Sequence, residues 1–383
     1  MATVCSIYHI EMVRLNPFQL VIIGTILEAS CFLFEIPTGI LADNYSRKLS
    51  LSLGLIIMGA GIFIEGYFPV FVVIAAAQVI WGTGATFLSG ADIAWISDEV
   101  TEKNVDHILL RGAQVRQLAL FFGIFVSIGI ACFAYNLPII FSGIILCLLG
   151  CCVLFIMPER RFQAHVNKSH NIIRRTLSTF SQGAAQIRGN KVLIFLIGVT
   201  LLGGLFSEGY DRLWTYRFLR DLRLPDLGAL DPIFWFAIIK ACAIALNLAI
   251  LEYVKRKVIH KEPTLILRTL FVIYTVLNSS ILIFAVTGRF SLALSSFWIS
   301  YAMRQANEPL NDVIFNKHIT NSKVRATVFS MRGQLDQVGQ ISGGPLIGAI
   351  AQHYSVSTGL LFSCVFITPI IFIYLFLLKQ QNK

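Results

Sequence analysis

Charged side chains stand inside several long apolar stretches of this sequence, where each costs roughly 2.5 to 3.5 kcal/mol to insert into a membrane. Two stretches carry a polar stripe whose members lie four residues apart. The stripes are Arg304, Glu308 and Asp312 in one stretch, and Arg332, Asp336 and Gln340 in the other. Residues four apart share one face of a helix, so each stripe is expected to face a cavity or another helix. The alternative is neutralisation within each helix, with Arg304 paired to Glu308 and Arg332 to Asp336.

Isolated carboxylates in apolar stretches are candidates for binding and releasing protons. Glu28 and Asp92 have no basic residue one helical turn away, and Glu35 lies two turns after Glu28 on the same face. Burial raises the pKa of a carboxyl group toward physiological pH, as a proton carrier requires. For Glu35 the alternative is a role in orienting the loop that follows it. Other charged residues that we assign to the intramembrane network are Arg116, Glu208 and Asp211.

The elements that hold these residues are predicted to be membrane-spanning helices. The chain of 383 residues is 56% hydrophobic and only 14% charged, with a mean hydropathy of +0.73. This composition excludes a mainly soluble enzyme. Spans of about 20 apolar residues are predicted at 17–42, 49–67, 70–97, 111–134, 137–157, 190–212, 231–254, 264–287, 290–315, 325–351 and 355–378. The fold class is therefore an all-α membrane protein.

The spans divide into two halves. Residues 1–157 form an N-terminal helical half, residues 158–189 a basic linker, and residues 190–383 a C-terminal helical half. Most Lys and Arg residues of the loops fall on the linker's side, which places the linker and the C-terminus in the cytoplasm of a multi-pass protein of the plasma (inner) membrane. Residues 1–13 are too short to span and are expected to be the end of an incomplete first helix.

One loop between two predicted spans carries a motif. Gly39-Ile-Leu-Ala-Asp43-Asn-Tyr-Ser-Arg47-Lys48 resembles the G-x-x-x-D-x-x-G-R-K signature of the major facilitator superfamily, with Ser46 in place of the second glycine. Gly39 is expected to allow close helix approach, and Asp43, Arg47 and Lys48 to form a gate at the cytoplasmic end. The neighbouring strings Phe34-Glu35-Ile-Pro-Thr and Trp81-Gly-Thr-Gly-Ala-Thr resemble the drug-efflux branch that includes tetracycline- and macrolide-type exporters.

This resemblance implies two six-helix halves, with the first helix truncated here, that rock around a site near the midplane. It implies proton-coupled export of small amphipathic compounds or drugs, driven by the proton gradient without a cofactor. The antiporter-type string Gly339-Gln-Ile-Ser-Gly343-Gly344-Pro345-Leu-Ile-Gly348 stands in the penultimate span. We interpret it as helix packing or a hinge, with substrate contact as the alternative. Where many proton-coupled relatives have an arginine in the fourth helix, this chain has Gln78.

No enzyme motif competes with a transporter, and the sequence predicts neither a metal site nor nucleic-acid binding. The eight cysteines lie in apolar stretches without a CxxC pair or a zinc-type histidine spacing, so disulfides are not expected either. The expected partners are a small-molecule substrate and the lipid bilayer, and the expected state is a monomer. Two alternatives stay open: a nutrient or metabolite transporter of the same fold, and a non-transporting remnant. A start codon placed too late would account for the short first helix.

Overall fold

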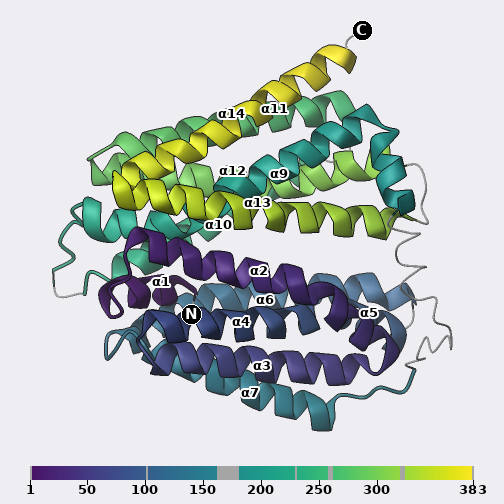
Figure 1. The fold of residues 1–383 in the computed structure, drawn as a ribbon, viewed down its shortest axis with the longest axis horizontal. Helices are drawn as coiled ribbons and strands as arrows, with labels where there is room; N and C mark the ends of the chain where they lie inside the picture. Colours follow the sequence, from purple (N-terminus) through teal and green to yellow (C-terminus); the bar gives the residue numbers. More distant parts are fainter. Residues whose placement is uncertain are drawn as a thin grey trace. The chain divides into compact units, whose positions relative to one another are not determined.

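A computed structural model describes residues 2–100, 102–161, 181–228, 231–257, 262–319 and 324–381. In this part of the chain the regular structure is helical throughout, with no β-strand (Figure 1). The helices of the first part are α1 (Ala2–Glu11), α2 (Pro17–Asn44), α3 (Arg47–Tyr67), α4 (Phe71–Leu88), α5 (Ala91–Glu99), α6 (Glu102–Ala131) and α7 (Leu137–Ile156). Those that follow are α9 (Lys191–Tyr216) with the π-helical turn η1 (Arg217–Asp221), α10 (Phe234–Lys257), α11 (Pro263–Val286), α12 (Phe290–His318), α13 (Arg325–His353) and α14 (Val356–Gln381).

The predicted all-α architecture is confirmed, and each predicted span coincides with a helix or a helix pair to within several residues. Among the described residues, nine segments are long and apolar enough to cross a membrane. Helices α12 and α13 are not among the nine, because their polar stripes lower the hydropathy. Each has 29 residues, which at 1.5 Å per residue gives a length of about 43 Å, more than a bilayer requires.

The chain forms two compact units. Unit 1 contains Met1–Lys168 and Ala229–Ala237, and unit 2 contains Ser169–Gly228 and Ile238–Lys383. The predicted linker 158–189 includes residues 162–180, which lie outside the described part of the chain. Its boundaries therefore stay a prediction.

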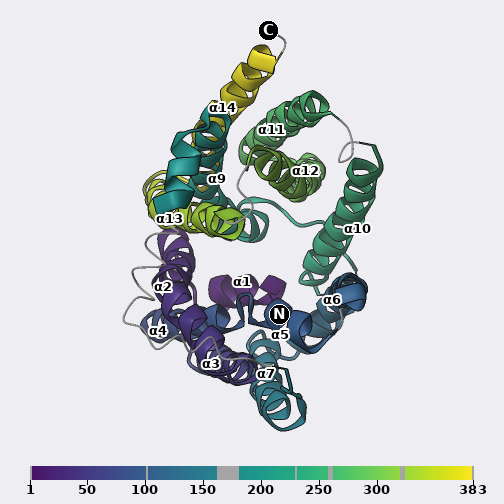
Figure 2. The same ribbon diagram turned by 90° about the vertical axis from the view of Figure 1, so that its right-hand side faces the viewer.

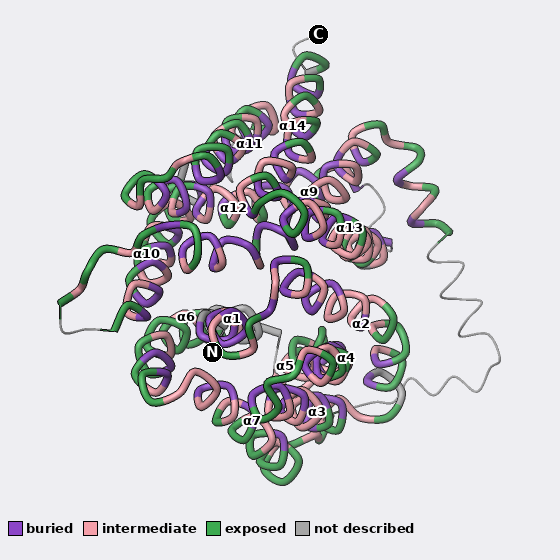
Figure 3. The backbone as a smooth tube through the Cα atoms, turned by 60° about the vertical axis from the view of Figure 1, so that its left-hand side comes forward, coloured by how far each residue is buried: buried purple, intermediate pink, exposed green. Residues whose placement is uncertain are grey.

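Within unit 1, α3 packs against α4 and α7 (Figure 2). Glycines make this close packing possible. A Cβ added to Gly84 would lie 2.4 Å from the backbone nitrogen of Met58, and one added to Gly59 would lie 2.7 Å from the carbonyl oxygen of Gly143. Helix α1 is mostly buried in the same unit (Figure 3), and its contacts include α6 and α7.

The span predicted at 70–97 is interrupted rather than continuous. Helix α4 ends at Leu88 and α5 begins at Ala91, with Gly90 between them at φ +74°. Only glycine adopts this left-handed conformation without strain. The interruption places Asp92 in the first turn of a short second helix, where Asp92 Oδ1 accepts a hydrogen bond of 2.7 Å from the backbone of Ile93.

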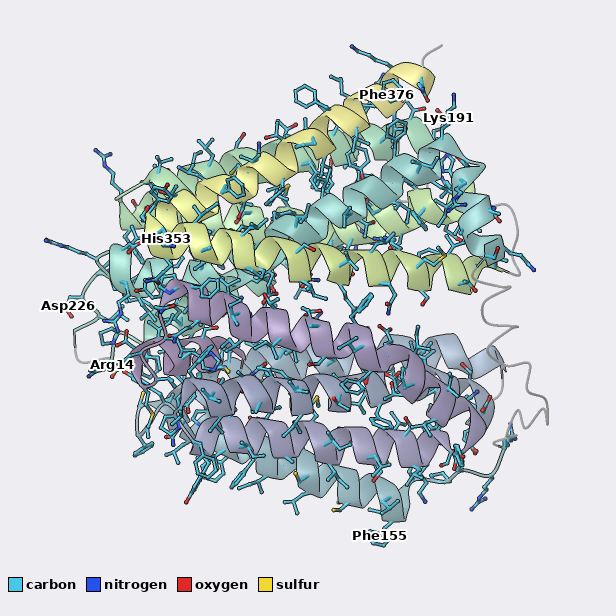
Figure 4. All side chains as sticks on the ribbon, viewed as in Figure 1. Arg14, Phe155, Lys191, Asp226, His353 and Phe376 are labelled. Carbon is cyan, nitrogen blue, oxygen red and sulfur yellow. The ribbon has the colours of Figure 1, made fainter. Side chains whose placement is uncertain are left out.

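Within unit 2, α9 packs against α13 and α14, and α11 packs against α12 and α14. The apolar surface that remains exposed is extensive in both units. On α7 the side chains of Ile145, Leu148 and Phe155 are 61%, 60% and 83% exposed, and Phe155 points away from its helix bundle (Figure 4). A contiguous apolar helix surface of this kind suits lipid rather than water.

Candidate functional site

A polar cavity of about 390 Å³ lies inside unit 2, between α9, α11, α12 and α13. Its lining contains four carboxylates and two guanidinium groups. The six residues are Asp211 on α9, Arg304, Glu308 and Asp312 on α12, and Arg332 and Asp336 on α13. With these groups ionised, the lining carries an excess of two negative charges. The two polar stripes predicted from the sequence therefore line one cavity.

The arginines of this cavity pair between helices and not within them. Arg304 makes a two-pronged ion pair with Asp211, in which Nη2 lies 2.8 Å from Oδ2. Arg332 pairs with Asp312 on the neighbouring helix. The alternative reading of the stripes, Arg304 with Glu308 and Arg332 with Asp336, is therefore wrong. A two-pronged pair fixes the planar guanidinium in direction as well as position.

Two carboxylates of the lining are not engaged by these pairs. Asp336 Oδ2 accepts a hydrogen bond of 2.9 Å from Gln340 Nε2, one helical turn further along α13. The Glu308 side chain is exposed into the space between the helices. Because both arginines are already paired, Glu308 and Asp336 carry the negative excess of the cavity.

Aromatic rings accompany the charged groups. The Arg304 guanidinium carbon lies 5.5 Å from the ring centres of both Phe206 and Tyr210, which is within cation–π distance. Phe206, Tyr274 and Phe329 line the cavity itself. The cavity thus offers flat apolar surfaces next to negative charge, a combination suited to an amphipathic cation.

The glycine string of α13 holds this helix against α9, beside the cavity. A Cβ added to Gly339 would lie 2.4 Å from the carbonyl oxygen of Leu201, and one added to Gly343 would lie 2.0 Å from that of Leu205. These distances are far below any normal contact. Gly344 and Gly348 are buried, and the helix continues through Pro345.

The loop motif is built into unit 1 through α3 and α5. Arg47 pairs with Asp98, and its Nη1 also donates to the carbonyl oxygen of Ala94 at 2.5 Å. At the start of α3, the Ser46 hydroxyl accepts from the backbone of Leu49 at 2.9 Å and thereby caps the helix. Ser46, which stands where the family signature has a glycine, is therefore the N-cap of α3.

Glu159, which follows α7, binds the same helix start. Its Oε2 accepts from the Ser46 hydroxyl at 2.6 Å and its Oε1 from the Lys48 backbone at 3.0 Å. A carboxylate here is favoured by the helix dipole. The side chain of Asp43 lies outside the described residues. A Cβ added to Gly39 would meet no atom within 4 Å, so the expected close approach at Gly39 is not found in the described part of the chain.

The remaining predicted residues are not among those that line the cavity of unit 2. Glu28 and Glu35 are half-buried on α2, Asp92 is exposed on α5, and Arg116 is exposed on α6, all in unit 1. Glu208 does belong to unit 2 but is not part of the cavity lining. It is 4% exposed and pairs with Arg212 at 2.8 Å within α9.

Two further charged residues, one partly buried and one fully buried, were not among the site residues selected from the sequence. Lys240 on α10 places its ammonium group 4.5 Å from the ring centre of Trp214 and 5.0 Å from that of Tyr301. Glu65 on α3 is fully buried and bonds to His9 on α1 at 2.7 Å. Glu65 could have been recognised from the sequence as a charged residue inside the predicted span 49–67, close to its end.

The structure brings one of the cysteines next to a histidine and a carboxylate. All eight cysteines are free thiols. However, Cys5 and His9 are four residues apart on α1, and the fold brings Glu65 to both of them. This cluster was not among the sequence predictions, because Cys5 and Glu65 are 60 residues apart and no local spacing joins them.

Many long apolar helices, a polar cavity among them and apolar outer surfaces are typical of a multi-pass integral membrane protein. The sequence profile of the Major Facilitator Superfamily matches residues 6–304. The chain therefore belongs to the Major Facilitator Superfamily, a family of transporters. The matched range includes the loop motif and two of the six charged cavity residues, Asp211 and Arg304, and it ends within α12.

Known proteins agree with this assignment. The chain is 25% identical to the uncharacterized MFS-type transporter YxaM of Bacillus subtilis (strain 168), over 95% of this chain and 88% of that protein. Its fold is similar to a variant of the nucleoside transporter NupG, with a TM-score of 0.73 at 15% identity over 98% and 94% of the two chains. It is also similar to a variant of the peptide transporter POT, with a TM-score of 0.74 at 12% identity over 100% and 91%. These structures share the fold.

Proposed function

We propose that this transporter exports small amphipathic organic cations in exchange for protons, by alternating access. The observation that carries the proposal is the charge of the unit 2 cavity, whose four carboxylates face only two arginines. A cation entering this cavity meets Glu308 and Asp336, which the arginines do not neutralise. The rings of Phe206, Tyr274 and Phe329 supply apolar surface for the rest of the molecule.

The same carboxylates suit exchange between a proton and the solute. A carboxyl group that holds a proton has no charge to offer a cation, so proton and cation compete for one group. Loading of the proton on one side of the membrane then drives release of the cation. Glu28, Asp92 and Glu35 of unit 1 are the further proton-coupling candidates. The basic loops support a plasma-membrane protein whose linker and C-terminus are cytoplasmic, and we propose a monomer.

A nutrient or metabolite transporter of the same fold is the second candidate. Two observations favour it: the similar solved structures are named as nucleoside and peptide transporters, and the two-pronged Arg304–Asp211 pair offers directional contacts to a polar solute. In this reading the cavity would select a neutral or zwitterionic molecule by hydrogen bonding.

The test uses cells stripped of their own exporters that produce the full chain, with membrane insertion measured in the same cells. Accumulation of ethidium, a flat aromatic cation, and of tetracycline is followed with and without a protonophore. We expect lower ethidium accumulation, and loss of this effect with the protonophore. Unchanged accumulation of both compounds despite good insertion would refute export, and uptake of radiolabelled nucleosides or dipeptides would then support the second candidate.

Variants connect the result to the cavity. A charge-assisted contact is worth about 1.5–3 kcal/mol, so Glu308→Gln or Asp336→Asn should weaken the apparent affinity for ethidium by about tenfold or more. Asp226→Asn is the matched control, because Asp226 is an exposed loop carboxylate outside the cavity lining. Equal export by all three variants would contradict the role of the cavity.

A further inference from the structure

Four polar side chains meet in the interior of unit 1, far along the chain from the cavity residues. Cys5 and His9 come from α1, Glu65 from α3 and Gln78 from α4. They are 6%, 1%, 0% and 1% exposed. A polar group in such surroundings is costly unless it is fully partnered. Neither the proposed transport cycle nor the loop motif uses these residues.

Three of the four side chains carry metal-ligating atoms that converge on one point. Glu65 Oε1 lies 2.7 Å from His9 Nε2 and 3.1 Å from Cys5 Sγ, and that sulfur lies 3.9 Å from His9 Nε2. Zinc bonds of about 2.0–2.3 Å in a tetrahedron separate neighbouring ligand atoms by about 3.3–3.7 Å. Two of the three distances are shorter than this range and the third is slightly longer. Admission of an ion therefore requires that the Glu65 oxygen move away from both His9 Nε2 and Cys5 Sγ, by roughly half an ångström.

The backbone presents the ligands in a suitable order. Cys5 and His9 are four residues apart, so both project from the same face of α1. Spacing of two ligands by one helical turn is a common way to hold zinc with a third ligand from another element. Here Glu65 is that third ligand, and the Tyr8 hydroxyl fixes the same turn of α3 by donating to the Glu65 carbonyl oxygen at 2.7 Å.

Gln78 provides an independent indication. Its amide nitrogen donates to Glu65 Oε2 at 2.8 Å, whereas its amide oxygen is buried without a hydrogen-bond partner in the described part of the chain. A buried acceptor without a donor is costly, and a cation or a water bound beside Glu65 would satisfy this amide oxygen.

We propose that Cys5, His9 and Glu65 bind a Zn²⁺-class transition-metal ion, with the Gln78 amide oxygen or a water as the fourth ligand. A thiolate, an imidazole and a carboxylate form a donor set of the kind found in zinc sites. On binding, the Cys5 thiol releases its proton to solvent and the sulfur forms a bond to the metal, while His9 binds through Nε2 and keeps its ring proton on Nδ1. The negative charges of the Cys5 thiolate and the Glu65 carboxylate then balance the two positive charges of the ion. The bound ion ties α1 to α3 and stabilises unit 1.

The test uses the purified full chain, freed of metal with a chelator and titrated with Co²⁺, which replaces Zn²⁺ and is visible by absorption. We expect a thiolate-to-cobalt charge-transfer band that saturates at one equivalent and is displaced by Zn²⁺. Loss of an outer-shell partner alone weakens metal binding by about 10–100-fold. Cys5→Ser, which removes a direct ligand, should therefore abolish the band and weaken Co²⁺ binding by more than about tenfold.

Cys364→Ser is the matched control, because Cys364 is also a buried thiol but lies in unit 2. This variant should keep the band. A band of unchanged intensity in Cys5→Ser, or no band in the wild-type protein, would overturn the proposal and leave the cluster as a hydrogen-bonded contact between α1 and α3. Should Cys5→Ser fail to fold, X-ray absorption of the zinc-loaded wild-type protein decides: one sulfur ligand supports the site, and a shell without sulfur refutes it.

Discussion

The contact between α9 and α13 can be tested by adding a single methyl group. In Gly343→Ala the new Cβ would lie 2.0 Å from the Leu205 carbonyl oxygen and 2.5 Å from the Leu205 Cα. An ordinary contact begins near 3.4 Å. Both neighbours are backbone atoms, so no side-chain rotation relieves the clash, and the two helices must separate by more than an ångström.

Overpacking of a well-packed core typically costs about 1–3 kcal/mol. The gain from replacing glycine by alanine inside a helix, about 0.5–1 kcal/mol, offsets only part of this cost. We therefore expect Gly343→Ala to lower the free energy of unfolding by about 1–2 kcal/mol. Because α9 and α13 both line the cavity, the same variant should lose cation export.

The matched control is Gly198→Ala, also a substitution within one of these two helices. A Cβ at Gly198 would meet no atom within 4 Å, so this variant should be as stable as the wild type or slightly more stable. Both variants are heated in detergent, and the fraction of the protein that remains monodisperse is measured at each temperature. Equal unfolding temperatures for Gly343→Ala and Gly198→Ala would show that α9 and α13 are further apart than the backbone distances at Gly343 indicate.

The remaining predictions concern the start of α3 and the residues bonded to it. Arg47→Ala leaves the Asp98 carboxylate without its partner. Since both side chains are partly buried, we expect the free energy of unfolding to fall by about 1–2 kcal/mol. Arg47→Lys should recover part of this loss, and equal melting temperatures of the alanine and lysine variants would contradict the prediction. Glu159→Gln removes the negative charge at the start of α3 and should lower the free energy of unfolding by about 0.3–1 kcal/mol. Ser46→Ala removes the cap of the same helix and should lower it by about 1 kcal/mol. In the double variant the two losses should not add, because Ser46 and Glu159 are bonded to each other.

The helices were predictable because hydropathy depends on sequence alone. A run such as 137–157 needs no partner to be recognised, and the helix found there, Leu137–Ile156, differs by one residue. The break at Gly90 was not predicted, since Ser89 and Gly90 are small and close to neutral in hydropathy and do not interrupt the apolar run. Glycine in a left-handed conformation has no signature distinct from glycine used for packing, as at Gly84.

The cavity was predictable only in part. Spacing of four residues placed Arg304 and Asp312 on one face of a helix, but the choice of ion-pair partner depends on how neighbouring helices are rotated. Asp211 and Arg304 are 93 residues apart, and no local pattern joins them. The cluster around Glu65 was missed for the same reason: His9 and Glu65 become neighbours only when α1 packs into unit 1.

The cross-helix pairs also change what the charged stripes imply. An ion pair within one helix is not broken when neighbouring helices move. The pairs Arg304–Asp211 and Arg332–Asp312, in contrast, each join two helices. In a low-dielectric interior, separation of such a pair leaves two unpartnered charges and is strongly unfavourable. Helices α9, α12 and α13 are therefore expected to keep their arrangement around the cavity unless a solute or a proton replaces one partner. This coupling gives the carboxylates of unit 2 a means to link occupancy of the cavity to helix motion.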